Sequence, residues 1–264
     1  MARVENIGVH PVKAFERVDV ESARISKGGI VEPDRLYAFQ KPNGDMVNGI
    51  ELDGVHDVTT SFDFETEELT ASAHGDRRHF DLRNDPDAAA EWFGDVLGVD
   101  LTLHRDPTHG FISRPEAGPS VVSTATLAEV ASWFDDLTPD DVRRRIRVNV
   151  EISGVPAFWE DQFVGDGAPA FEAGGIRFEG HEPCARCVIP QRDPDTGERT
   201  PDDFRSTFLE RREETFPEWA DFEAFEHYFR LMLIASVPGA DRGKTLSIGD
   251  EVEVVGESRI PDAN

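Results

Sequence analysis

The sequence predicts a mostly β fold, of β-barrel type, with a few helices. Short segments that are rich in β-branched residues and alternate in polarity recur along most of the 264 residues. A helical spacing of apolar residues occurs in only a few places. Because many short strands with few helices favour a barrel over alternating βαβ units, we expect barrel architecture.

Residues 1–85 are predicted to form an N-terminal β-domain. Its expected strands cover residues 4–9, 18–25, 35–39, 55–64, 69–73 and 79–82, and a strong turn signal, Lys-Pro-Asn-Gly-Asp, occupies residues 41–45. Residues 86–99 are expected to connect this domain to the next one through a helix over residues 86–97. Pro86 suits the first turn of that helix, and Ala89, Phe93 and Val96 share one face.

Residues 100–257 are predicted to form a second β-barrel domain, against which the first one packs. Its expected strands cover residues 101–104, 147–152, 176–180, 184–189, 229–236 and 251–255. Thr126 and Glu129 have the spacing of a capping box, which predicts an amphipathic helix that ends before Pro139. An acidic, aromatic stretch over residues 202–225 is expected to be helical.

The charge of the chain is strongly acidic, with 53 Asp and Glu against 27 Lys and Arg and a formal net charge of -26. This composition resembles that of halophilic proteins. A field of this sign repels phosphate backbones and anionic lipid surfaces, so we expect neither nucleic acid nor a membrane as a partner. A site for an anionic ligand must therefore gather its own positive charge.

The sequence also indicates where in the cell the protein is located. The first residues, Met-Ala-Arg-Val-Glu-Asn, do not resemble a signal peptide, and no window approaches the 18 apolar residues of a membrane-spanning helix. Two cysteines are too few for a disulfide framework. We expect a soluble, cytoplasmic protein.

Both cysteines stand in residues 183–187, which read Pro-Cys-Ala-Arg-Cys. A structural zinc site needs four ligands, and adding His181 gives only three. A thioredoxin-like pair belongs in a βαβ setting, whereas the surroundings here are β. A single thiolate that binds a soft transition metal held mainly by another ligand fits better, with Arg186 stabilising the thiolate or facing an anion.

Two further patterns have plain structural interpretations. If residues 184–189 form a strand, Cys184 and Cys187 point to opposite faces and do not both reach one metal unless the backbone bulges. Residues 193–197, Asp-Pro-Asp-Thr-Gly, form a turn when taken alone. The other histidines are scattered without metal-binding spacing, and we interpret them as structural, whereas His181 is close enough to the cysteines to be near a metal.

Several of these segments together resemble the MOSC family, and their order matches from end to end. In particular they resemble the branch of the amidoxime-reducing component of mitochondria and its bacterial relatives, which joins an N-terminal β-barrel domain to a MOSC domain. The segments that carry the resemblance are His10-Pro11-Val12-Lys13, Asp34-Arg35, Arg147-Val148-Asn149, Ile152-Ser153-Gly154, Glu160-Asp161, the cysteine segment, residues 193–197 and Ile248-Gly249-Asp250-Glu251-Val252.

The resemblance implies a molybdenum-molybdopterin cofactor between the two domains. It implies that the second cysteine, Cys187, is the protein ligand of molybdenum and the catalytic residue, whereas Cys184 does not coordinate. It also places certain residues around the pterin and its phosphate: Lys13, Arg35, Arg147, Asn149, Ala185 and Arg186. Charge-assisted bonds from such cations suit an anionic ligand, and Lys13 is one of only four lysines.

The sequence departs from the family pattern at three places. Val148 stands where proline is usual, Ala14 where a serine that contacts the cofactor is common, and Asn48-Gly49 where a stretch containing arginine follows the N-terminal hairpin. The lost hydroxyl removes a neutral hydrogen bond worth about 0.5 to 1.5 kcal/mol, which weakens cofactor binding without abolishing it.

By resemblance, the expected reaction is the reduction of an N-hydroxylated small molecule at molybdenum. No cysteine follows Cys187 and no Gly-x-Gly-x-x-Gly fingerprint occurs, so electrons are expected from a separate ferredoxin or flavoprotein. Two other functions stay open: a sulfur-carrier or cofactor-handling protein that uses a cysteine persulfide, and a binding module that retains the fold without the metal.

Overall fold

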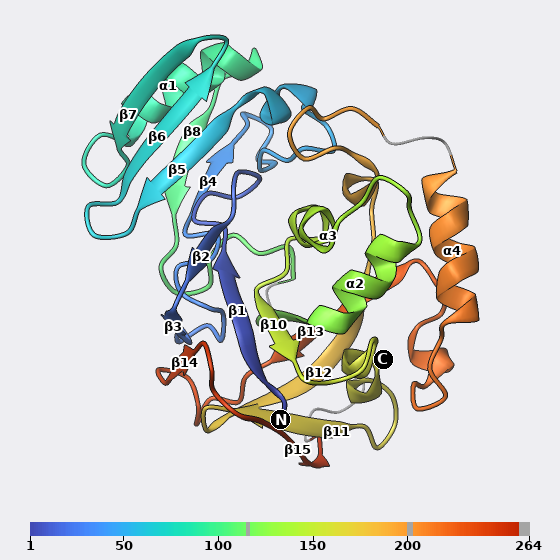
Figure 1. Cartoon of the computed structure of the whole chain (residues 1–264). Coiled ribbons are helices and arrows are strands. Elements are labelled where there is room, and N and C mark those ends of the chain that lie inside the picture. Colours follow the sequence, from blue (N-terminus) through green and yellow to red (C-terminus); the bar gives the residue numbers. More distant parts are fainter. Residues whose placement is uncertain (115–116, 200–202, 259–264) are drawn as a thin grey trace.

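The computed structural model describes residues 1–114, 117–199 and 203–258, and Figure 1 shows how their elements are arranged. Strands cover 33% of the chain and helices 22%, which confirms the mostly β prediction. Three separate groups of buried apolar side chains form the core of the described part of the protein.

The largest sheet contains eight strands in the order β15-β11-β12-β13-β9-β10-β1-β2. All its neighbours are antiparallel except β9 and β10, which pair in parallel between Val121 and Val150. The bounds are β1 (Arg3–Val9), β2 (Val18–Val20), β9 (Ser120–Ser123), β10 (Val150–Ser153), β11 (Pro169–Ala173), β12 (Ile176–Ala185), β13 (Arg230–Ser236) and β15 (Val252–Glu257).

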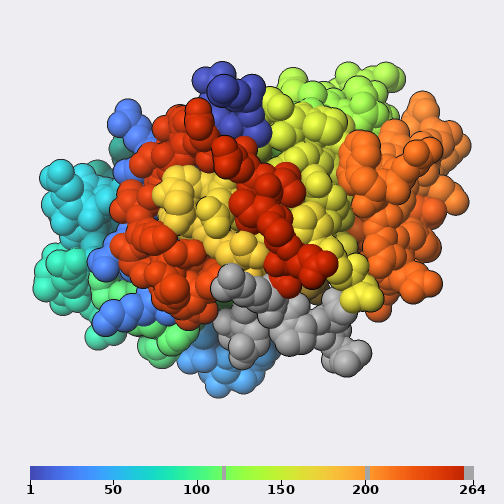
Figure 2. All heavy atoms as spheres, turned by 90° about the horizontal axis from the view of Figure 1, so that it is seen from below, coloured from blue at the N-terminus to red at the C-terminus, as the bar shows by residue number. Residues whose placement is uncertain are grey.

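This sheet is not the closed barrel that the sequence predicted, since no closed barrel forms among the described strands. The start of β15 approaches the start of β1, which β2 leaves uncovered: Arg3 and Glu251 form one isolated bridge, and Val252 N donates to Ala2 O at 3.0 Å. Figure 2 shows the C-terminal segment, in red, beside the N-terminus, in blue. The contact is limited to the start of β1, so the sheet stays open.

A second group of strands lies at one end of the molecule with helix α1 (Pro86–Leu97) (Figure 1). It contains the pair β4 (Tyr37–Gln40) and β8 (Thr102–Arg105) and the three-stranded sheet β5 (Thr59–Asp63), β6 (Glu68–Ala73) and β7 (Asp76–Asp81). The helix has the predicted bounds, with Asp85 as N-cap and Gly98 in the left-handed region at its end. Its Phe93 is fully buried among the aromatic rings of this group.

The chain passes between the two groups more than once. Strands β1 and β2 belong to the large sheet, whereas β8 pairs back onto β4. A further pair, β3 (Ser22–Arg24) with β14 (Thr245–Ser247), joins the N-terminal and C-terminal parts. The segment between β1 and β2 leaves the large sheet and reaches the second group, where Val12 bridges to Tyr37 of β4.

Helices α2 (Thr124–Ser132), α3 (Pro139–Ile146) and α4 (Phe204–Glu214) accompany the large sheet. The capping box predicted for α2 is wrong: Ser123 caps the helix by accepting from Thr126 N at 2.9 Å, and the Thr126 hydroxyl instead accepts from Phe158 N. Helix α3 was not predicted. It starts with a capping box between Thr138 and Asp141.

The remaining differences concern the ends of predicted elements and strands that were not predicted. The predicted strand over residues 55–64 begins as the 3-10 helix η1 (Asp53–Asp57), and the predicted helix over residues 202–225 is confined to α4 and the short η4 (Phe222–Ala224). Residue 202 lies outside the described residues. Strands β9, β11 and β14 were not predicted, and η2 (Trp159–Phe163) and η3 (Ile189–Gln191) complete the described elements.

Candidate functional site

A cavity of about 460 Å³ lies where the N-terminal segments meet α3 and the loop after β12. Of its 24 lining residues, eight are Lys or Arg and only three are Asp or Glu, which reverses the charge balance of the whole chain. The basic residues are Lys13, Arg17, Arg35, Arg143, Arg144, Arg145, Arg147 and Arg192. This local excess of positive charge has the chemistry of an anion-binding site.

Lys13 enters the cavity from the segment after β1. Its backbone N donates to Tyr37 O at 2.8 Å, which fixes this segment beside β4. Its ammonium donates to Phe111 O at 2.7 Å. Burial, together with the nearby Arg35 and Arg147 charges, lowers the pKa of Lys13 to about 8.

Arg35 is positioned by a buried polar pair beneath it. The carboxylate of Asp34 accepts from the backbone N of His10 at 2.8 Å and forms an ion pair with Arg35. Burial alone would raise the pKa of Asp34, but Arg35 and the hydrogen bonds from His10 hold it well below its usual range. Burial and the Arg147 charge lower the pKa of His10, so its imidazole adds no positive charge.

Arg147 follows the last residue of α3 and ends the helix in the left-handed region, with φ of 58°. This conformation turns the chain toward β10. One guanidinium nitrogen donates to Phe15 O at 2.8 Å. Burial and the charge of Arg35 lower the pKa of Arg147 to about 9.

Several residues that line the cavity have a strained backbone conformation. Three non-glycine residues with positive φ line the cavity, namely Ala14 at 79°, Arg35 at 51° and Arg147 at 58°. Side chains other than glycine adopt this conformation at a cost, and such residues cluster at functional sites. The surrounding hydrogen bonds hold two cations in a costly backbone conformation that aims them at one space.

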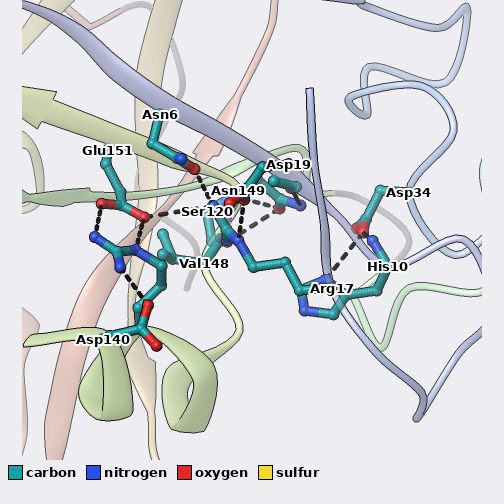
Figure 3. A network of polar contacts seen from close by, with 12 residues as sticks. Asn6, His10, Arg17, Asp19, Asp34, Ser120, Asp140, Val148, Asn149 and Glu151 are labelled. Carbon is teal, nitrogen blue, oxygen red and sulfur yellow. Dashed lines mark hydrogen bonds and ion pairs between the residues drawn. The ribbon is translucent and has the colours of Figure 1, made fainter. Parts of the chain in front are cut away.

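The other arginines of the wall are largely neutralised by acidic partners. Arg143 makes two bonds to the fully buried Glu151, at 2.6 and 2.9 Å, and a third to Asp140 at 2.6 Å. Arg17 bonds Asp19 at 2.7 Å and Glu151 at 3.4 Å (Figure 3). In the described part of the chain, Lys13 and Arg147 form no ion pair with a carboxylate. Their charges are therefore the least compensated ones at the cavity.

Asn149 does not line the cavity. Its side-chain oxygen accepts from the N and the hydroxyl of Ser120, at 3.1 and 3.0 Å, and its amide donates to Gly8 O at 3.1 Å. These bonds join β9, β10 and β1, as Figure 3 shows for Asn149 and Ser120. In this structure the amide has a structural role, and it is not brought together with Lys13, Arg35 and Arg147.

The cysteine segment differs from the predicted strand. Strand β12 ends at Ala185, and Cys187 lies in the following loop, so the argument that residues three apart on a strand face opposite ways does not apply here. Cys184 is buried and Cys187 is exposed. The Cys187 sulfur accepts from Ile189 N at 3.4 Å, and Ile189 lines the cavity.

Arg186 and Ala185 are not among the residues that line the cavity. One nitrogen of the Arg186 guanidinium lies 3.2 Å from the sulfur of Cys184, and another donates to Ile146 O at 3.2 Å. Ala185 pairs with Arg230 of β13. The thiol that Arg186 contacts is thus that of Cys184, while the exposed sulfur of Cys187 lies one residue further along.

The predicted turn over residues 193–197 is present and connects two walls of the cavity. The Asp193 carboxylate accepts from the backbone N of residues 195 and 196, both at 2.9 Å. Asp195 accepts from Arg144 of α3 at 2.9 Å. Arg192, just before the turn, forms an ion pair at 2.8 Å with Asp53 of η1. These bonds fix the loop after Cys187 against both halves of the molecule.

Sequence reasoning missed the arginines of α3 and Arg192 because each looked like an ordinary surface cation. The Thr138-Pro139 start and the Asp141 position were available signals for a helix that places four arginines within five residues, 143–147. His10, interpreted from the sequence as structural, bonds Asp34 and also lines the cavity.

The chain is mostly β, and cations line the cavity between its two halves, which is the chemistry of an anion-binding site. Comparison with family models assigns residues 1–100 to the MOSC N-terminal beta barrel domain and residues 109–253 to the MOSC domain. The chain therefore belongs to the MOSC family, whose domains are associated with molybdenum-cofactor proteins. No curated protein matches the sequence.

Among solved structures, the chain is similar to the YUAD protein from Bacillus subtilis. The identity is 14%, the TM-score is 0.44, and 97% of each chain is covered.

None of the described helices has the length and apolar character needed to span a membrane. Within residues 1–114, 117–199 and 203–258, His, Cys, Asp and Glu do not gather in groups of three or more that could hold a metal ion.

Proposed function

We propose that the cavity binds a molybdenum-molybdopterin cofactor and that the protein is an oxidoreductase that reduces N-hydroxylated small molecules. Lys13, Arg35 and Arg147 would hold the pterin phosphate, and Cys187 would ligate the metal. The observation that carries this proposal is the pair of poorly compensated cations, Lys13 and Arg147, inside a chain of net charge -26. Holding like charges together without a ligand is unfavourable, and an anion relieves that cost.

The residues present fit such a ligand. The volume of about 460 Å³ lies within the usual range for cofactor pockets. Cys187 does not itself line the cavity, but Ile189, two residues after it, does, and Cys187 is exposed, so its thiol stands in the loop that borders the cavity. A phosphate beside Lys13 would also counteract the charges of Arg35 and Arg147, which together with burial lower the pKa of Lys13.

The departures from the family pattern affect individual bonds only. Ala14 lines the cavity without a hydroxyl, and Asn48 lines it where an arginine stretch is usual. Val148 is fully buried, and its carbonyl accepts from Arg17. A valine thus serves at this position as part of the support beneath the cationic wall.

When bound, the molybdenum centre would supply oxygen-atom removal and accept electrons one at a time. The chain's own residues would bind and orient: Lys13, Arg35 and Arg147 by charge-assisted hydrogen bonds, and Cys187 through its sulfur. A separate ferredoxin or flavoprotein would deliver the electrons. Nucleic acid and membrane surfaces are not proposed as partners, because the overall field is strongly negative.

The exposed thiol of Cys187 favours one second candidate, a sulfur-carrier function in which Cys187 carries a persulfide. The two functions differ in what the protein holds after purification. A sulfur carrier would hold sulfane sulfur on Cys187 and stoichiometric molybdenum would be absent, whereas the oxidoreductase would hold molybdenum and pterin.

The proposal is tested by replacing Lys13 and Arg147 by alanine, each singly, in protein made in a host that produces the cofactor. Pterin and molybdenum contents should fall in both variants, while reduction of benzamidoxime by reduced methyl viologen, expressed per bound molybdenum, should change much less. Unchanged cofactor content with lost turnover would move these residues from cofactor binding into the chemistry.

A further inference from the structure

The cavity has a second set of lining residues that differs in character from the cationic set. Residues 47–58, which lead into and through η1, contribute Val47, Ile50, Val55 and Val58, and the loop after Cys187 contributes Ile189. None of these side chains is charged. This part of the cavity is therefore suited to an apolar group of a ligand. Its residues take no part in binding a phosphate.

His56 is the only titratable side chain that residues 47–58 contribute to the cavity. Its Nε2 atom is buried and has no hydrogen-bond partner among the described residues. Leaving a buried ring nitrogen without a partner costs free energy, and such groups in folded proteins call for an explanation. A polar group on a ligand in the adjoining cavity would supply the missing partner.

Two glycines make room for the imidazole ring. A methyl group placed on Gly49 would lie 3.0 Å from Nε2 of His56 and 3.4 Å from Cδ1 of Ile189. A methyl group placed on Gly197 would lie 2.8 Å from both Cβ and Cγ of His56. The turn over residues 193–197 therefore holds one side of the ring, and Nε2 lies on the side of Gly49 and Ile189.

This position connects His56 to the proposed metal ligand. Ile189 N donates to the sulfur of Cys187, and the Ile189 side chain borders the same space as Nε2. The loop that carries His56 is also tied to the cysteine loop by the ion pair between Arg192 and Asp53. The imidazole thus lies beside the loop where the reaction would take place.

We propose that His56 is a substrate-binding residue whose Nε2 forms a hydrogen bond with the N-hydroxyl group of the substrate, while residues such as Val55 and Ile189 contact an apolar body. This inference rests on the proposed function and goes beyond it by assigning the substrate side of the cavity.

Direct binding and kinetics of benzamidoxime test the inference, because binding is measured by calorimetry whether or not turnover occurs. Replacing His56 by alanine should weaken benzamidoxime binding about tenfold, the scale of one hydrogen bond, and raise KM with a smaller effect on kcat. His56→Gln, which keeps a hydrogen-bonding group, should retain most of the affinity. Pterin and molybdenum contents should stay at the parent level in both variants.

The chain offers a matched control in His104 of β8. Its Nε2 is likewise buried without a partner in the described residues, but it does not line the cavity. His104→Ala should leave benzamidoxime binding unchanged, and melting temperatures of all variants identify any loss of folding.

Three results would overturn the inference: parent protein that binds no benzamidoxime, His56→Ala that binds it as the parent does, or tighter binding of the 4-carboxylate analogue than of benzamidoxime. Absence of molybdenum and pterin from the parent would instead contradict the proposed function.

Discussion

Replacing Lys13 by methionine tests whether the cavity holds its positive charge for an anion. The pKa of Lys13 falls from 10.5 to about 8, and at about 1.4 kcal/mol per pKa unit this sets an upper limit of about 3.5 kcal/mol on the cost of the charge. The side chain is partly exposed, and solvent screening reduces this cost to about 1–2 kcal/mol. The lost bond to Phe111 O offsets about 1 kcal/mol.

The ligand-free variant should therefore be as stable as the parent, or up to about 1 kcal/mol more stable, at pH 7. Because the folded-state pKa lies below the unfolded value, the unfolded chain holds more protons between pH 8 and 10.5. The stability of the ligand-free parent should rise with pH across that window through this group, and the variant should lack this rise.

The assay is thermal melting with and without pyrophosphate, at an ionic strength matched with KCl. At about 100 times its dissociation constant, pyrophosphate should stabilise the parent by about 2.7 kcal/mol, and most of this effect should be lost in Lys13→Met. Lys244→Met is the control, because Lys244 is half-exposed, is paired with Asp241 and does not line the cavity. Equal responses of parent and Lys13→Met to pyrophosphate would refute the reasoning.

Four further predictions concern the rest of the molecule. The melting temperature should rise from low to multimolar KCl, because salt screens the self-repulsion of a net charge of -26; a melting temperature indifferent to salt would contradict this. Asn149→Ala should lower the free energy of unfolding by about 2–3 kcal/mol, since Ser120 and Gly8 lose their partner; loss of cofactor without loss of stability, measured by urea unfolding and pterin content, would show direct cofactor contact instead. Cys187→Ala should abolish turnover per bound molybdenum, whereas Cys184→Ala should cost about 1 kcal/mol of packing and keep most activity; equal loss in both would indicate a paired dithiol, and X-ray absorption would count the sulfur ligands. The isolated protein with NADH should not reduce benzamidoxime until a carrier protein is added, and turnover without a carrier would argue against an external donor.

The sequence predicted elements whose cause is local. Helix α1 has the predicted bounds because Asp85, Pro86 and Gly98 define its ends within the segment itself. Helix α3 was missed because it buries little besides Val142, Arg145 and Ile146, so its apolar periodicity is weak even though its cap is strong. Strand β9 has only four residues and lies between β13 and β10, and such pairing is set by tertiary structure.

The residues of the candidate site also divide into those that the sequence could indicate and those that only the tertiary structure reveals. Lys13, Arg35 and Arg147 could be named from the sequence through family resemblance, and they line one cavity. Asn149 matches the same motif, but its amide bonds Ser120 and Gly8, which no sequence pattern reveals. His56 gave no signal, because its surroundings include Gly197, which lies far from it in the sequence.

The central claim, that this chain holds a molybdenum-pterin cofactor, is tested most directly by the composition of the purified protein. Protein made in a cofactor-producing host should be analysed for metals by mass spectrometry and for pterin by the fluorescence of its oxidised form. The account predicts molybdenum and pterin near one equivalent each per chain in the parent, and less of both in Lys13→Ala and Arg147→Ala. Parent protein without molybdenum and pterin, or with sulfane sulfur on Cys187 in their place, would contradict it.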